Sequence, residues 1–232
     1  MLHRLVSSAT YRQSSRAGPQ ARKRDPDNTL LSRSPSRRLS AEMIRDQALA
    51  VSGLLVRRIG GPSVKPYQPP GLWQEKSGAQ YKPDTGEGLH RRSLYTFWKR
   101  TSPPPSMMIF DVAKRDVCVA RRQVTNTPLQ ALVLLNDPQF VEAARALAER
   151  VLAEGGRSED ERITFAFRLL TGRRPTRPEL STLRRLQADL LAMSARQAVR
   201  PDDENTPGSP ELAACTLICS TLLSYDAAVT IR

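Results

Sequence analysis

Helical start signals recur along the second half of the chain and divide it into regular segments. A capping residue followed by proline begins a segment within residues 125–128, and again at 137–138 and 209–210. Proline fits the first turn, because its missing N–H would have no helical partner there. Ser158 and Thr176 each precede a glutamate by three residues, which is the pattern of a capping box. We therefore predict five helices between residues 125 and 226.

Apolar side chains follow these starts at intervals of three and four residues, as expected for the buried face of a helix. The last segment, from 209 to 226, is apolar almost all round and is predicted to be the central, most buried helix. A polar loop at 200–208 precedes it. The residues expected to face the core in the other four helices are Leu129, Leu132, Val133, Leu135, Phe140, Ala144, Leu147, Val151, Ile163, Ala166, Phe167, Leu170, Leu180, Leu183, Leu186 and Leu190.

The first half of the chain is more irregular. Ser40 is a capping residue for one helix, which should end near Gly53 or at residues 60–61. Residues 11–38 are polar, basic and broken by proline, so we expect them to be irregular or extended.

Proline also dominates the segments that follow this helix. Residues 62–75 are too rich in proline for a helix or a central strand, and 76–87 indicate an exposed loop. The apolar spacing within 91–100 favours a short helix over a strand, and three prolines stop it. SMMIFD, residues 106–111, is expected to be a short strand or a buried extended segment.

Together these segments predict an all-α fold, an irregular helical bundle of about five or six helices with a long Pro-rich loop layer and little or no strand. We divide the chain into a truncated or irregular basic N-terminal segment, 1–38, and a helical domain, 39–232. Within that domain, 39–60 holds the first helix, 61–124 the loop layer and 125–232 the C-terminal bundle.

Charge and hydropathy narrow the classes of function. The formal net charge of +13 favours anionic partners. Charge-driven nucleic-acid binding is disfavoured, because the arginines are scattered and no stripe of aromatic and basic residues accompanies them. No apolar run approaches the roughly 18 to 20 residues needed to cross a bilayer, so no transmembrane segment is predicted. The first residues resemble an organelle transit peptide in composition but lack the apolar core of a secretory signal.

Three cysteines, Cys118, Cys215 and Cys219, are too few and odd in number for a disulfide framework. Cys215 and Cys219 lie four residues apart within the last helix, where buried structural thiols are the ordinary case. Half of a metal site is the alternative, although no histidine is near in sequence. A CxxCH motif is absent, so we expect no cofactor, and in particular no covalently attached haem, in this segment.

The sharpest polar constellation precedes the first helix of the C-terminal bundle. Arg121, Arg122, Thr125 and Asn126 combine two guanidinium groups with the free N–H groups of a helix start, a combination that suits an anion. The alternative is structural: Thr125 or Asn126 caps the helix and the arginines pair with the nearby carboxylates of Asp111, Asp116 or Asp137.

Two further hypotheses concern glycans and catalysis. Trp73 and Trp98 flank the Pro-rich region and could stack on a carbohydrate, although packing of loops onto the core is the commoner use of such rings. A nucleophile–base pair would need His3 or His90, and both lie in polar surroundings. Nothing in the sequence singles out a pair of carboxylates either, so no catalytic residue is predicted.

Three long strings together carry a family resemblance: RLSAEMIRDQALAVSGLL with GGPSVKPYQPPGLW, RRSLYTFWKRTSPPPSMMIFD, and RRQVTNTPLQALVLLNDPQFVEAARALAERV. They resemble the planctomycete-type domain of unknown function 1553, from about His3 to the end of the chain. The resemblance implies the C-terminal part of a longer extracytoplasmic protein that also contains a cytochrome-c-like domain, with HRLVSSATYRQSSR as an internal segment and not a leader.

That resemblance brings no established activity. It implies a non-catalytic binding or structural C-terminal module whose partners are an upstream cytochrome-like domain or an anionic glycan. The alternatives are part of a hydrolase or polysaccharide-processing enzyme completed by an upstream region, and charge-driven nucleic-acid binding. The salt dependence of binding distinguishes nucleic-acid binding from the other hypotheses, because charge-driven binding collapses as ionic strength rises.

Overall fold

Helices dominate the computed structural model of the chain, which describes residues 1–197 and 209–231. The predicted loop at 200–208 lies outside the described residues. The elements are α1 Leu2–Val6, α2 Pro19–Arg24, β1 Arg37–Arg38, α3 Ala41–Ser52, α4 Leu72–Ser77, η1 Gly86–His90, η2 Ser93–Tyr95, α5 Pro105–Ile109, α6 Pro128–Asn136, α7 Pro138–Glu154, α8 Glu159–Thr171, α9 Arg177–Gln197, α10 Pro210–Leu223, α11 Asp226–Val229 and β2 Thr230–Ile231.

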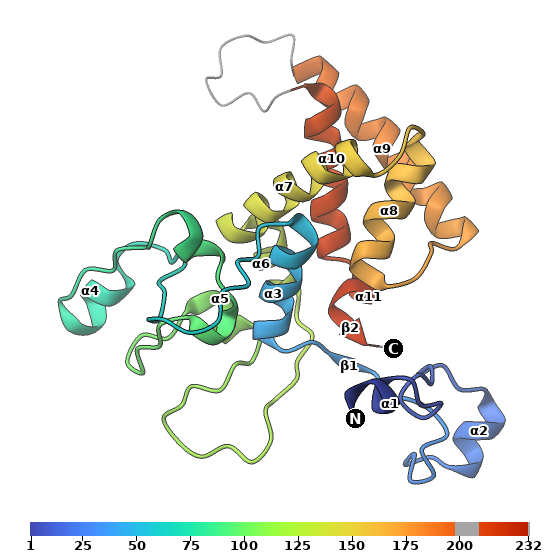
Figure 1. Cartoon of the computed structure of the whole chain (residues 1–232), viewed down its shortest axis with the longest axis horizontal. Coiled ribbons are helices and arrows are strands. Elements are labelled where there is room, and N and C mark those ends of the chain that lie inside the picture. Colours follow the sequence, from blue (N-terminus) through green and yellow to red (C-terminus); the bar gives the residue numbers. More distant parts are fainter. Residues whose placement is uncertain (198–208, 232) are drawn as a thin grey trace.

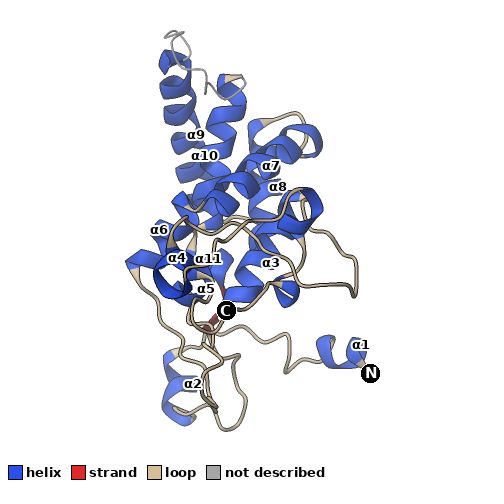
Figure 2. Cartoon of the chain, turned by 90° about the vertical axis from the view of Figure 1, so that its left-hand side faces the viewer, coloured by secondary structure: helices blue, strands red, loops and turns tan. Residues whose placement is uncertain are grey.

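This architecture confirms the prediction of a mostly α-helical fold. Within the described ranges, the strands form one two-stranded antiparallel sheet, in which β1 pairs with β2 near the C-terminal end. The long helices α7 to α10 gather at one end of the molecule, and the loops and short helices lie at the other (Figure 2). None of the described helices combines the length and apolar character needed to cross a membrane.

The last long helix, α10, is the centre of the bundle, as its all-round apolar sequence predicted. It packs against α6, α7, α8 and α9, and Figure 1 shows it between α7 and α9. Cys215 of α10 lies against α7, with its thiol 3.8 Å from the Ala148 carbonyl, and the small side chains of Ala143, Ala144, Ala214 and Cys219 are all buried. Such side chains let two helix axes approach closely, because the separation of packed helices depends on the residues at the contact.

Local capping signals place the helix boundaries. Ser40 accepts a hydrogen bond from the backbone N–H of Met43 at the start of α3, and Gly53 ends that helix with a φ of 83°. Ser158 and Glu161 form the predicted capping box of α8. The left-handed conformation at Gly53 favours glycine, which has no Cβ to clash with the backbone.

The loop layer differs from the prediction in two places. Residues 91–100 are not a helix: η2 is a single turn, and beyond it Phe97 donates its backbone N–H to Val64 O at 2.7 Å. Pairing with a distant segment therefore replaces local helical bonds. Residues 106–111 are not extended either, because α5 begins at Pro105, whose fixed φ suits a first helical turn.

Two segments that were expected to be irregular contain single short helices. α2 lies within residues 11–38, and α4 begins inside the Pro-rich stretch 62–75. Both begin after a glycine and have six residues, so each adds about one and a half turns to an otherwise irregular backbone. Sequence periodicity cannot identify a helix this short, since six residues contain too few positions to define an apolar face.

Buried guanidinium groups hold the loop layer against the bundle. Arg91 is fully buried, stacks 3.8 Å from the Tyr95 ring centroid and donates to the carbonyls of Arg58 and Gly60 at 2.9 and 2.6 Å. Arg45, from α3, donates to the carbonyls of Leu89 and Arg91 at 2.6 and 2.8 Å. Burial lowers the pKa of Arg45 to about 10, so the group stays charged at neutral pH.

We expect Arg45→Met to destabilise the protein by about 2–4 kcal/mol, because the substitution keeps the length of the side chain but leaves two buried carbonyls without donors. Arg92→Met is the matched control: Arg92 is largely exposed, with one ion pair of 3.7 Å to Asp46, so its loss should change stability by about 0.5 kcal/mol or less. Chemical denaturation measures both, and equal effects of the two substitutions would contradict this role of Arg45.

Candidate functional site

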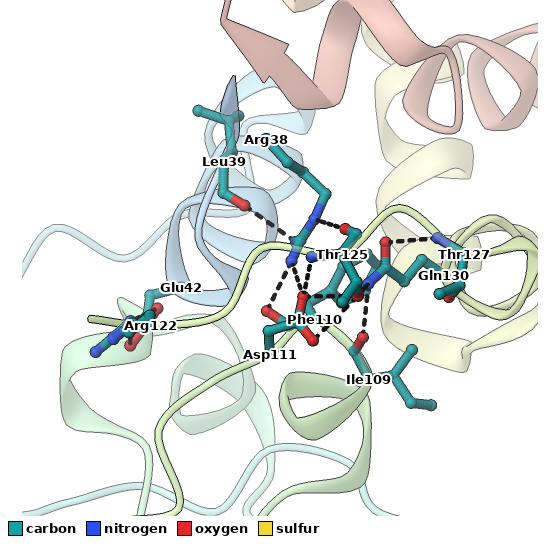
Figure 3. A network of polar contacts seen from close by, with 10 residues as sticks. All are labelled: Arg38, Leu39, Glu42, Ile109, Phe110, Asp111, Arg122, Thr125, Thr127 and Gln130. Carbon is teal, nitrogen blue, oxygen red and sulfur yellow. Dashed lines mark hydrogen bonds and ion pairs between the residues drawn. The ribbon is translucent and has the colours of Figure 1, made fainter. Parts of the chain in front are cut away.

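A polar network fixes the residues that precede α6 (Figure 3). Its centre is the carboxylate of Asp111, which follows α5 with a left-handed φ of 59°. The carboxylate accepts the backbone N–H of Thr125 at 2.7 Å, the Thr125 hydroxyl at 2.8 Å and an Arg38 N–H at 2.6 Å. Two segments that are 14 residues apart in sequence are therefore joined through one side chain.

Arg38 brings a third segment to this network from β1. Its buried guanidinium also donates to the carbonyls of Thr125 at 2.8 Å, Phe110 at 3.1 Å and Leu39 at 3.1 Å. The same group lies 5.4 Å from the centroid of the Phe110 ring. A single cation thus satisfies backbone groups on both sides of the seam between β1 and the loop before α6.

Gln130 extends the network into α6. Its side-chain amide donates to the Thr125 hydroxyl at 3.0 Å and to the Ile109 carbonyl at 2.9 Å, and its oxygen accepts the Thr127 N–H at 3.4 Å. The N-cap is Thr127, so the expectation that Thr125 or Asn126 caps this helix is wrong. Thr125 cannot serve as the cap because its hydroxyl already bridges Gln130 and Asp111.

The arginines of the predicted anion site have separate surroundings. Arg122 lies 2.9 Å from both carboxylate oxygens of Glu42 on α3, and not beside the aspartates that the sequence suggested (Figure 3). Arg121 and Asn126 are exposed, and the described part of the chain offers their side chains no polar partner. An external anion would have to displace Glu42 from Arg122 or Asp111 from Thr125, so anion binding here stays a prediction.

Both tryptophans pack within the loop layer. Trp73 is 8 % exposed, and its ring lies 4.9 Å from that of Tyr81 and 5.8 Å from that of Phe97. Trp98 is half-buried, donates its indole N–H to the Lys114 carbonyl at 3.1 Å and has Arg115 over its ring at 4.7 Å. Glycan stacking stays a prediction, and Trp73 would have to be uncovered to take part.

The groups considered for catalysis or metal binding are dispersed. His90 Nε2 lies 3.0 Å from Glu142 Oε1, and His3 is exposed on α1. Cys215 and Cys219 are buried free thiols on α10, as predicted, whereas Cys118 is exposed. Across residues 1–197 and 209–231 no group of three or more His, Cys, Asp and Glu side chains is arranged to hold a metal ion.

The outer face of α6 is apolar and open to solvent. Leu129, Leu132 and Leu135 are 52, 55 and 42 % exposed, although the sequence predicted that they face the core. The buried side of α6 instead carries Leu134, which packs in the core, and Gln130 of the polar network. Because apolar residues occur on several sides of this short helix, their spacing alone could not indicate which side is covered.

The Asp111 carboxyl should make part of the stability dependent on pH. Burial raises its pKa, but the hydrogen bonds from Thr125 and the charge of Arg38 outweigh burial and hold the pKa below its ordinary value. A carboxyl of this kind contributes fully above its unfolded pKa, about 3.9, and loses its contribution as the pH falls through the folded pKa. The wild-type protein should therefore lose stability on acidification below about pH 4.

Asp111→Asn tests this dependence, because asparagine also tolerates a left-handed φ, removes the charge and replaces one accepting oxygen by an NH2 group. We expect a loss of about 1.5–3 kcal/mol at pH 7, and a difference from wild type that narrows as the pH falls below about 4. Denaturant titrations across pH 3–7 measure both effects. Glu149→Gln, which removes an exposed ion pair with Arg145, should keep the wild-type pH profile, and a constant Asp111→Asn difference would refute the assignment.

The family model described as PSD1, a protein of unknown function (DUF1553), matches residues 1–187. The match includes the basic N-terminal segment, the loop layer and the helices as far as the middle of α9. No curated protein and no solved structure matches the chain. The matched region is well over half of the sequence, and the chain belongs to the DUF1553 family of proteins of unknown function.

Proposed function

We propose that the chain is a non-catalytic binding module of a larger extracytoplasmic, cytochrome-linked protein, and that α6 docks against the cytochrome-like domain. The observation that supports this most directly is the exposed row of Leu129, Leu132 and Leu135 on α6. Residues three apart on a helix are neighbours, so the three side chains form one continuous apolar strip. Covering a leucine side chain fully is worth about 1.5–3 kcal/mol, which favours an interface over an open surface.

The loop between α5 and α6 enlarges this docking surface. It extends away from the helices and leads directly into α6 (Figure 1). Val117, Val119 and Val124 of this loop are all exposed. Apolar side chains that continue from a helix onto an adjoining loop are typical of a surface that a partner covers.

Charge favours an acidic partner over a second copy of the chain. Lys114 and Arg121 lie on the same loop as the exposed valines, and the formal net charge of the whole chain is +13. Association of two copies would bring like charges together, which opposes dimer formation. A partner with an apolar patch surrounded by carboxylates would instead complement both the leucines of α6 and the basic loop. Charge opposes a second copy, and the family's implied organisation makes the cytochrome-like domain the proposed partner.

The polar groups support a binding role and not a catalytic one. Asp111, Arg38 and Arg122, which carry the most concentrated chemistry near α6, are engaged by each other or by the backbone and Glu42. A catalytic side chain must reach a substrate, and these side chains hold the chain's own segments together. If one of these side chains turned toward a substrate, the contacts that hold the loop before α6 would be lost.

The double substitution Leu132→Asp with Leu135→Asp tests the docking face. Calorimetric titration of the purified chain with the separately prepared cytochrome-like domain should show binding that the double variant weakens at least about tenfold, a change of about 1.4 kcal/mol. Leu94→Asp is the control: Leu94 is 73 % exposed on η2, so its replacement should leave the affinity unchanged.

Three outcomes would replace the proposal. Self-association that the double variant abolishes, seen by ultracentrifugation, would assign α6 to a second copy. Binding of DNA that collapses between low and high salt would favour the nucleic-acid alternative. An equal loss of affinity in Leu94→Asp would show that added negative charge, and not the α6 face, controls binding.

A further inference from the structure

A second feature lies apart from α6, in a cavity of about 530 Å³ near the C-terminal end of the chain. The N-terminal segment contributes Ser14 and Arg16, the turn between α8 and α9 contributes Arg173 and Arg174, and α11 with β2 closes the remaining side. Its volume lies within the range of about 300–1,000 Å³ that is usual for small-molecule sites.

Arginines supply the charged part of the lining of this cavity. Its described lining contains three arginines and no aspartate or glutamate. Arg16 and Arg174 line the cavity and are exposed, and no carboxylate of the described residues lies within ion-pair distance of either guanidinium. Arg38, by contrast, has a carboxylate and several carbonyls of its own chain beside it.

The third arginine is already neutralised. Arg173 binds both oxygens of Glu179, at 2.6 and 2.8 Å, and Glu179 also accepts the backbone N–H of Thr176 and the Tyr225 hydroxyl. This cluster anchors the α8–α9 turn, and so fixes the backbone from which Arg174 projects. Arg16 and Arg174 therefore supply the free positive charge of the cavity, while Arg173 positions one of them.

The neutral part of the lining is partly apolar. Leu39, Leu170, Ala228 and Ile231 contribute hydrocarbon surface, and the Ser14 hydroxyl accepts the backbone N–H of Arg16 at 3.1 Å. Guanidinium groups bind carboxylates, sulfates and phosphates with paired hydrogen bonds, and hydrocarbon walls favour an apolar body. The lining thus combines the two features that an amphiphilic anion requires.

We propose that this cavity is a binding site for a compact oxyanion, a phosphate, sulfate or carboxylate on a partly apolar body, and that Arg16 and Arg174 bind the charged group. The apolar body lies against Leu39 and Leu170. This site is independent of the docking face on α6, because none of the residues that line the cavity belongs to α6 or to the loop before it.

Calorimetric titration of the full chain with 1-naphthyl phosphate, 1-naphthyl sulfate and 1-naphthoate tests the proposal and distinguishes the three oxyanions. At least one of them should bind, neutral 1-naphthol should bind more weakly, and inorganic phosphate or sulfate should also bind more weakly because it lacks the apolar body. Arg16→Gln and Arg174→Gln should each reduce affinity about tenfold, since each removes a charge-assisted hydrogen-bonding group.

Arg12→Gln and Arg177→Gln are matched controls, because both arginines are exposed, lie close in sequence to the proposed pair and do not line the cavity. They change the net charge equally and should leave affinity unchanged. Equal losses in all four variants would mean general attraction to a basic surface and would overturn the site, as would a failure of all three naphthyl anions to bind. Thermal melts of every variant confirm that the comparison is made on folded protein.

Discussion

The arrangement of the loops depends on buried guanidinium groups that donate to backbone carbonyls. A loop without regular pairing leaves its carbonyls without partners, and an unpaired carbonyl is costly once it is buried. Arg38, Arg45 and Arg91 meet this requirement, because one guanidinium offers five N–H donors in a fixed plane. Much of the Pro-rich layer can therefore be ordered against the helices without forming a sheet.

Burial of these cations has a free-energy cost, because they lose their contact with water. Desolvation disfavours a charged guanidinium, which is why the pKa of Arg45 falls to about 10. Several strong hydrogen bonds offset that cost, and Arg91 gains further from its contact with the Tyr95 ring. Substituting lysine would not preserve the arrangement, since Arg45 bonds to the Leu89 and Arg91 carbonyls through two different nitrogens and an ammonium has only one.

The elements that could be predicted from the sequence are those set by local chemistry. Helices begin where expected at Ser40 and Ser158, and at the two cap–proline pairs Asp137-Pro138 and Ser209-Pro210. The hydrogen bonds of a cap form within four residues of the chain, so local sequence is enough to predict them. The apolar character of α10 predicted its central position because a helix that is apolar on all sides must be covered on all sides, whichever face meets each neighbour.

Errors arose where distant segments decide the conformation. Tyr95 and Phe97 pair with Val64 instead of continuing a helix. Gln130 bonds to Ile109 and Thr125 on the side of α6 that also buries Leu134, and Leu129, Leu132 and Leu135 remain exposed. Nor could the sequence separate buried arginines from exposed ones, since both types are surrounded by similar residues. The polar character of residues 121–126 is evident from the sequence, but two of their partners, Glu42 and Arg38, lie more than 70 residues away.

The distribution of partners therefore says more about function than the net charge does. Arg38 and Arg122 bind carbonyls or a carboxylate of their own chain. Such a cation stabilises the fold and cannot attract a ligand strongly, because its charge is already paired. The cations that retain attraction are those without such partners, and in a cavity their fields add because water is partly excluded. By this reasoning Arg16 and Arg174 outweigh the more conspicuous pair at 121–122, because Arg122 binds Glu42 and Arg121, although unpaired, does not line the cavity.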